Sequence, residues 1–75
     1  GGWPGKSQGR EKVKFSRTES GDYDVSKGLA NYGTIQKGGV NARWQWVIDG
    51  SDMYGDDNLN TLKRLVRDEV NDWTN

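Results

Sequence analysis

The chain has 75 residues, with 11 Lys or Arg, 11 Asp or Glu, no His and no Cys. A chain this short forms one domain with a small core, and the lack of cysteine excludes disulfides and thiolate metal sites. Because the usual general base and the thiol nucleophile are both missing, we expect no enzyme activity, no cofactor and no metal. No apolar run approaches the roughly 18 residues of a membrane span. We therefore expect no membrane partner and, without cysteine, a cytoplasmic location.

The zero net charge conceals two halves of opposite sign. Residues 1–47 contain eight Lys or Arg and four Asp or Glu, whereas residues 48–75 contain three Lys or Arg and seven Asp or Glu. Such a split is typical of a polyanion-binding surface backed by an acidic one. A self-complementary surface without a partner explains it equally well.

The first eleven residues, GGWPGKSQGRE, are rich in glycine and have no hydrophobic period. This composition predicts a flexible tail at 1–11 and a single domain at 12–75. Within the domain, apolar and polar residues first alternate with the period of half-buried strands. We expect strands at 12–17, 23–26, 30–37 and 42–49, with a short fifth strand or extended arm at 51–55.

The hydrophobic period then changes from two residues to 3.6 in the segment DDNLNTLKRLVRDEVNDW, residues 56–73. Asp57 or Asn58 is suited to cap the resulting helix. The helix's apolar stripe contains Leu59, Leu62, Leu65, Val66, Val70 and Trp73. The sequence therefore predicts an α+β fold: an antiparallel meander of four or five strands with one C-terminal amphipathic helix packed on one face.

Trp44 and Trp46 raise the question of which sheet face the helix covers. Leaving both in water would forfeit several kcal/mol of burial energy, so we expect them in the core rather than in an aromatic platform for a ligand. A type I′ turn at Asp49-Gly50 would pair Ile48 with Ser51 and Trp46 with Met53. The helix-covered face would then contain Val13, Phe15, Tyr23, Val25, Ile35, Trp44, Trp46, Ile48 and Met53.

The opposite face is expected to be polar. Its members by alternation are Lys12, Lys14, Ser16, Asp22, Asp24, Tyr32, Thr34, Gln36, Arg43, Gln45 and Tyr54, with Val47 as the apolar exception. Bases, amides and tyrosines are groups that contact phosphates and stack on nucleobases. A sheet covered on one side nevertheless has a polar outer face without any ligand, and lysine on an edge strand prevents aggregation.

The acidic segment that begins at Asp56 does not form an EF-hand. Calcium loops of that class need Gly at position 6 and Glu at position 12, where this chain has Thr61 and Arg67.

The W-x-W strand, the Asp-Gly turn and the amphipathic helix, over residues 32–73, resemble in pattern two sheet-plus-helix modules. These are the arm-binding domains of tyrosine recombinases and the plant AP2-type domain. The resemblance implies DNA binding by a sheet inserted into the major groove, although both modules are typically more basic.

We therefore expect a small non-catalytic module that binds nucleic acid, DNA in the first place, through its outer sheet face and basic tail. Tyr32, Arg43 and Gln45 are the expected base contacts. The full predicted set is Lys12, Lys14, Arg17, Tyr32, Gln36, Lys37, Arg43 and Gln45. The alternative is a protein-interaction domain that acts through a sheet edge or the acidic helix, or an accessory structural domain of a longer protein.

Overall fold

A computed structural model of the chain describes residues 12–74. The tail predicted at 1–11 lies outside the described residues. The elements are β1 (Val13–Arg17), β2 (Tyr23–Lys27), β3 (Ala30–Lys37), β4 (Trp44–Ile48), β5 (Ser51–Asp56) and α1 (Leu59–Thr74). The predicted α+β fold is confirmed, and residues 51–56 form a complete fifth strand. No helix within residues 12–74 is both long and apolar enough to cross a membrane.

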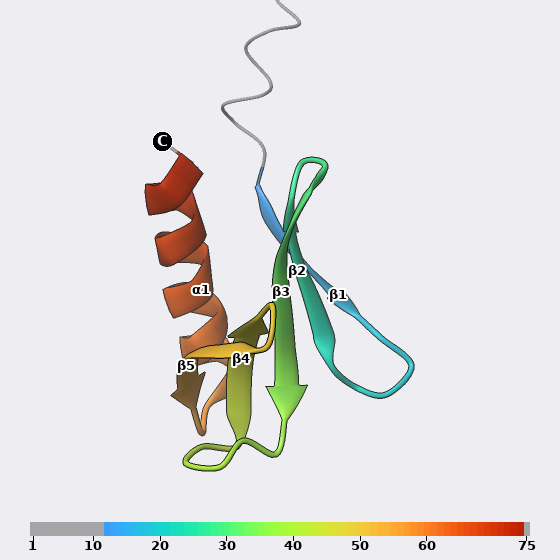
Figure 1. The fold of residues 1–75 in the computed structure, drawn as a ribbon, viewed down its shortest axis with the longest axis vertical. Helices are drawn as coiled ribbons and strands as arrows, with labels where there is room; N and C mark the ends of the chain where they lie inside the picture. The colour runs from blue at the N-terminus through green and yellow to red at the C-terminus, as the bar shows by residue number, and fades with distance from the viewer. Residues whose placement is uncertain (1–11, 75) are drawn as a thin grey trace, which may run out of the picture.

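The five strands form one antiparallel meander in the order β1-β2-β3-β4-β5, so that β1 and β5 are its two edges. Figure 1 shows α1 standing beside the sheet. The helix contacts β4 and β5 and also reaches β1 at the other edge. In the β4–β5 hairpin, Asp49 and Gly50 have φ of 50° and 81°. Positive φ at both central residues is the type I′ geometry that the Asp-Gly pair predicted.

The core lies between the sheet and the helix. Its fully buried members are Val25, Ile35, Trp46, Leu62, Val66 and Val70. The core position predicted for Trp46 is confirmed, and the half-buried Trp44 packs against the same cluster. Trp46 also satisfies its polar atom, since its Nε1–H donates to the Tyr32 carbonyl oxygen at 2.7 Å.

Asn58 begins the helix as its N-cap. The Thr61 backbone N–H donates to Asn58 Oδ1 at 3.1 Å, which satisfies one of the amide groups left free in the first turn. Asp57 has a different partner, because its Oδ1 accepts the backbone N–H of Arg43 at 3.0 Å. This bond connects the start of the helix to the loop before β4.

A β-bulge in β3 reverses the alternation of side chains along that strand. Asp24 pairs with Thr34 but Ser26 pairs with Asn31, so Tyr32 and Gly33 together lie opposite Val25. Gly33 has φ of 88°, a conformation in which glycine avoids steric strain. The bulge turns the Tyr32 ring toward the helix, 6.3 Å from the Trp73 ring. The prediction that Tyr32 lies on the outer face is therefore wrong.

A second irregularity, in β5, changes the other hairpin in the same way. Val47 pairs with Asp52 and Gln45 pairs with Gly55, so Met53 and Tyr54 both lie opposite Trp46. The simple Trp46–Met53 pair was a wrong prediction, and Met53 is exposed rather than part of the core. Tyr54, predicted on the outer face, instead stacks on Trp46 with ring centroids 6.0 Å apart.

Candidate functional site

The outer face of the sheet is polar, as predicted, but it is not basic. One cross-strand row runs over all five strands as Ser16, Asp24, Thr34, Val47 and Asp52. Beside it lie Lys14 paired with Ser26, and Gln36 paired with Gln45. In these rows Lys14 contributes one positive charge, whereas Asp24 and Asp52 contribute two negative charges. This face therefore offers little electrostatic attraction to a polyanion.

The structure distributes the predicted binding residues over several places. Lys14, Gln36 and Gln45 do lie on the outer face. The Gln45 side chain is occupied there, because its Nε2 donates to the Tyr54 carbonyl oxygen at 3.1 Å within the β5 irregularity. A ligand would have to break this bond to use Gln45 as a donor.

Three other predicted residues belong to the helix side. Tyr32 packs against the core. Lys37 places its Nζ 5.5 Å from the centroid of the Trp44 ring, a cation–π distance. Arg17 pairs with Tyr23 and so alternates with the outward-facing residues of β1. These three cannot act together with Gln36 on one flat surface.

The last two predicted residues lie in irregular segments at different ends of the molecule. Arg43 ends the loop between β3 and β4, at the bottom of Figure 1, whereas Lys12 immediately precedes β1, which begins near the top. Both are exposed. A single small ligand therefore cannot contact both.

The charges of α1 are sorted to the two sides of its buried stripe. At about 100° per residue, Lys63, Arg64 and Arg67 fall on one side, and the acids Asp68, Glu69 and Asp72 fall on the other. Tertiary contacts show which side faces which strand. Lys63 Nζ lies 5.6 Å from the Phe15 ring of β1 and 4.3 Å from the Tyr23 ring of β2. Tyr54 of β5 donates from its hydroxyl to Glu69 Oε2 at 2.9 Å.

The basic side of the helix thus joins β1 to form a cationic edge. We define it by Lys12, Lys14, Arg17, Lys63 and Arg67, of which Lys14 extends from the outer face of the edge strand β1. Strand β1 contains no acidic residue, and the β1-facing side of α1 contains none either. Sequence reasoning missed Lys63 and Arg67 as site residues. The signal was present in their helical spacing, but only packing showed that they face the basic strand.

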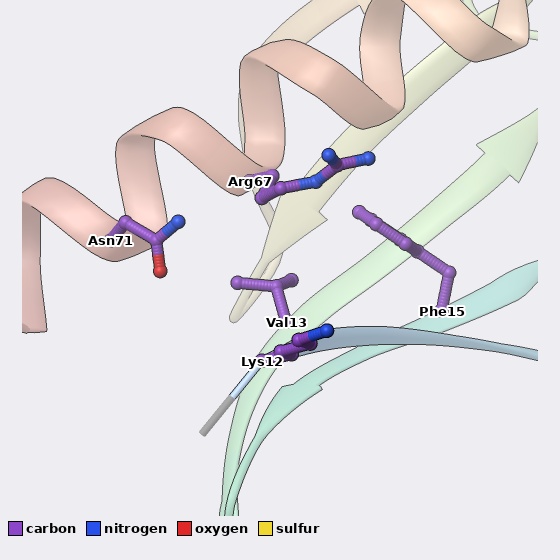
Figure 2. A pocket seen from close by; sticks show the side chains of 5 residues that line it. All are labelled: Lys12, Val13, Phe15, Arg67 and Asn71. Atoms are coloured by element: carbon purple, nitrogen blue, oxygen red, sulfur yellow. The ribbon is translucent and has the colours of Figure 1, made fainter. Parts of the chain in front are cut away.

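A groove opens at this edge between β1 and α1, with a volume of about 370 Å³. Figure 2 shows the side chains that line it. Val13 and Phe15 rise from the strand as an apolar floor, and Lys12, Arg67 and Asn71 surround it with polar groups. The β1–α1 groove combines apolar surface with positive charge, which is a common property of sites for anions with a flat organic part.

The opposite edge, formed by β5 and the other side of the helix, is acidic. Asp52 and Asp56 of β5 lie on the same edge as Glu69. The hydrogen bond to Glu69 and its negative charge raise the pKa of the Tyr54 phenol above its ordinary value. Met53, Tyr54, Leu65 and Trp73 are exposed large side chains of β5 and the helix.

Neither a metal site nor a known relative identifies the function. Among residues 12–74, no three His, Cys, Asp or Glu side chains gather where they could hold a metal ion. Comparison with known proteins finds no matching family model, no matching curated protein and no matching solved structure. The cationic edge and the β1–α1 groove are therefore the features of the described residues that indicate a function.

Proposed function

We propose that this protein is a small nucleic-acid-binding module that holds the phosphate backbone on its cationic edge rather than on the outer face of its sheet. The observation that supports the proposal most directly is the clustering of five cations, from β1, the residue before it and α1, along one edge, with no carboxylate in β1 or on the side of α1 that faces it. Positive charge concentrated in this way attracts polyanions over a distance of about a Debye length.

The spacing of the cations suits an extended anionic chain. Alternate residues of a strand lie about 7 Å apart, and residues four apart on a helix rise about 6 Å. Lys12, immediately before β1, and Lys14 within it therefore repeat at nearly the same interval as Lys63 and Arg67 along α1. Lys12 and Arg67 line the groove from its two sides, whereas Lys14 extends from the outer face of β1, so the two rows can contact successive phosphates of a chain that runs along the edge.

Fluorescence anisotropy with labelled single-stranded DNA, duplex DNA and RNA, at several salt concentrations, tests the proposal. If all five cations contact phosphates, log Kd should change with log salt with a slope of magnitude about 4.5 for duplex and about 3.5 for single strands. Absence of binding at low salt, where attraction is strongest, contradicts the proposal.

A pair of charge reversals locates the surface. Arg67→Glu and Arg43→Glu change the net charge equally, but only Arg67 belongs to the cationic edge, whereas Arg43 is in the β3–β4 loop. We expect Arg67→Glu to weaken binding about tenfold or more and to lower the salt slope by about one or more. A loss confined to Arg43→Glu would favour the surface predicted from the sequence instead.

Protein binding at the acidic edge is a second candidate function. It is favoured by the exposed Leu65 and Trp73, which accompany Glu69 on the β5-facing side of α1. Exposed apolar side chains surrounded by carboxylates fit a basic amphipathic partner. Binding of a Lys-rich amphipathic peptide that is lost in Leu65→Glu, together with no binding of nucleic acid, would support this function over the first.

A further inference from the structure

The β1–α1 groove has the character of a site for one flat group rather than for a large ligand. Its volume of about 370 Å³ is near the lower end of ligand pockets. Val13 and Phe15 supply apolar surface from the strand, and both are half-buried, so that part of each side chain remains available. Phe15 is the aromatic ring that lines the groove.

The polar groups of the groove are donors. Lys12 and Arg67 carry N–H groups and no acceptor. Asn71 could accept, but its Oδ1 already receives the Lys27 ammonium at 3.1 Å, and the same ammonium donates to Thr74 Oγ1 at 2.6 Å. In Figure 2 the Asn71 side chain extends from α1 with its amide nitrogen on the side of Arg67. A ligand that satisfies this site must bring acceptors and negative charge together with a flat body.

We propose that the β1–α1 groove takes one nucleotide of a single-stranded nucleic acid. The base lies against Phe15 and Val13 and accepts from the Asn71 amide, while the adjoining phosphate lies between Lys12 and Arg67. This inference rests on the proposed function and specifies its ligand. Bases in a duplex are paired and stacked, and an aromatic side chain reaches a base face only where the base is unstacked. The site therefore prefers single strands to duplex.

Abasic strands separate this inference from simple phosphate binding. A labelled single strand and the same length of strand made of abasic nucleotides carry equal numbers of phosphates, whereas the matching duplex carries twice as many. Base stacking on an aromatic ring is strong enough that we expect the intact strand to bind about tenfold tighter than the abasic one. Equal affinity for the intact and abasic strands would overturn the inference and leave the proposed function standing. Binding of none of the three would overturn both.

Phe15→Leu tests the residue that contacts the base. Leucine keeps the side chain apolar but removes the ring, so we expect the intact strand to fall to the affinity of the abasic strand, whose own affinity stays unchanged. The abasic strand is the internal control, because an unfolded variant would lose both, and the thermal midpoint of the variant checks the fold. Retention of the tenfold preference in a folded Phe15→Leu protein would overturn the assignment of the base to Phe15.

A free nucleotide is the other source of the same chemistry. A nucleoside 5′-monophosphate should displace the labelled strand only at concentrations well above the strand's own Kd, because it contacts one phosphate instead of several. Displacement at concentrations equal to that Kd would overturn the assignment to a strand, and would identify the free nucleotide as the ligand.

Discussion

Replacement of Gly33 by alanine tests whether the β3 bulge, which turns Tyr32 toward the helix, depends on glycine. At φ of 88°, a residue with a Cβ is strained by about 1–2 kcal/mol. An alanine Cβ would also collide with the Val47 carbonyl oxygen and approach Ile48 Cγ1 at 2.7 Å. Because the carbonyl belongs to the neighbouring strand, relief requires β3 and β4 to move apart, at a further cost of about 1–3 kcal/mol.

Gly50→Ala is the matched control. Gly50 has a similar φ of 81°, yet no atom lies within 4 Å of the position where its Cβ would stand. We therefore expect Gly50→Ala to lose only the conformational component of about 1–2 kcal/mol, and Gly33→Ala to lose about 2–5 kcal/mol. A domain of this length has a total stability of about 4–11 kcal/mol, so Gly33→Ala should be close to unfolding.

Urea denaturation monitored by tryptophan fluorescence measures both losses. With a slope near 1 kcal/mol/M, the lower end for small domains, the midpoint of Gly33→Ala should fall about 1–3 M below that of Gly50→Ala. In thermal unfolding each kcal/mol corresponds to about 4–8 °C. Equal midpoints for the two variants would show that the sheet accommodates a Cβ at Gly33, and the argument that packing enforces the bulge would fail.

Asn58→Ala should destabilise the protein by about 1 kcal/mol, because it removes the acceptor of the Thr61 N–H. Asn60→Ala, at an exposed helix position, should not destabilise the protein. Similar urea midpoints for Asn58→Ala and Asn60→Ala would contradict the role of Asn58 as the N-cap. Trp46→Phe should lower the free energy of unfolding by about 2–3 kcal/mol, since it removes the donor to the Tyr32 carbonyl and part of a buried side chain. A loss below about 0.5 kcal/mol would mean that this hydrogen bond contributes little. The raised pKa of Tyr54 means that the folded state favours the protonated phenol. Its stabilising effect is present below the ordinary pKa of 10.0 and is lost as pH rises through the raised value. In thermal scans above pH 10, Tyr54→Phe should therefore lose less stability than the wild type, and parallel pH curves would refute the role of Glu69.

Local periodicity predicted most of the secondary structure. Alternation with period two identified the strands, and the change to period 3.6 located the helix, because each pattern reflects how one element exposes one face. The same reasoning placed Trp46 in the core, since a domain with so little apolar surface cannot leave a tryptophan in water. Asp49-Gly50 likewise predicted its turn from two adjacent residues.

Alternation failed where the strands are irregular. The sheet faces predicted for Tyr32 and Tyr54 were wrong because counting alternate residues assumes regular strand pairing. One extra residue in a strand reverses the face of every position beyond it. The sequence did contain a glycine next to Tyr32, but a strand glycine by itself does not indicate on which side of it the pairing shifts. That is decided by the neighbouring strand, whose Val47 carbonyl occupies the space beside Gly33.

The sequence alone determined the charged residues of the chain, its strands and helix, and the residues able to form a core, because these depend on neighbours a few positions apart. Only the tertiary structure decided where the charges meet. Burial of Leu62, Val66 and Val70 fixes the rotation of the helix about its axis. With that rotation set, Lys63 and Arg67 must lie beside β1, and Glu69 must lie beside β5. The cationic edge and its groove thus follow from the packing of residues some fifty positions apart in the chain, which no local pattern contains.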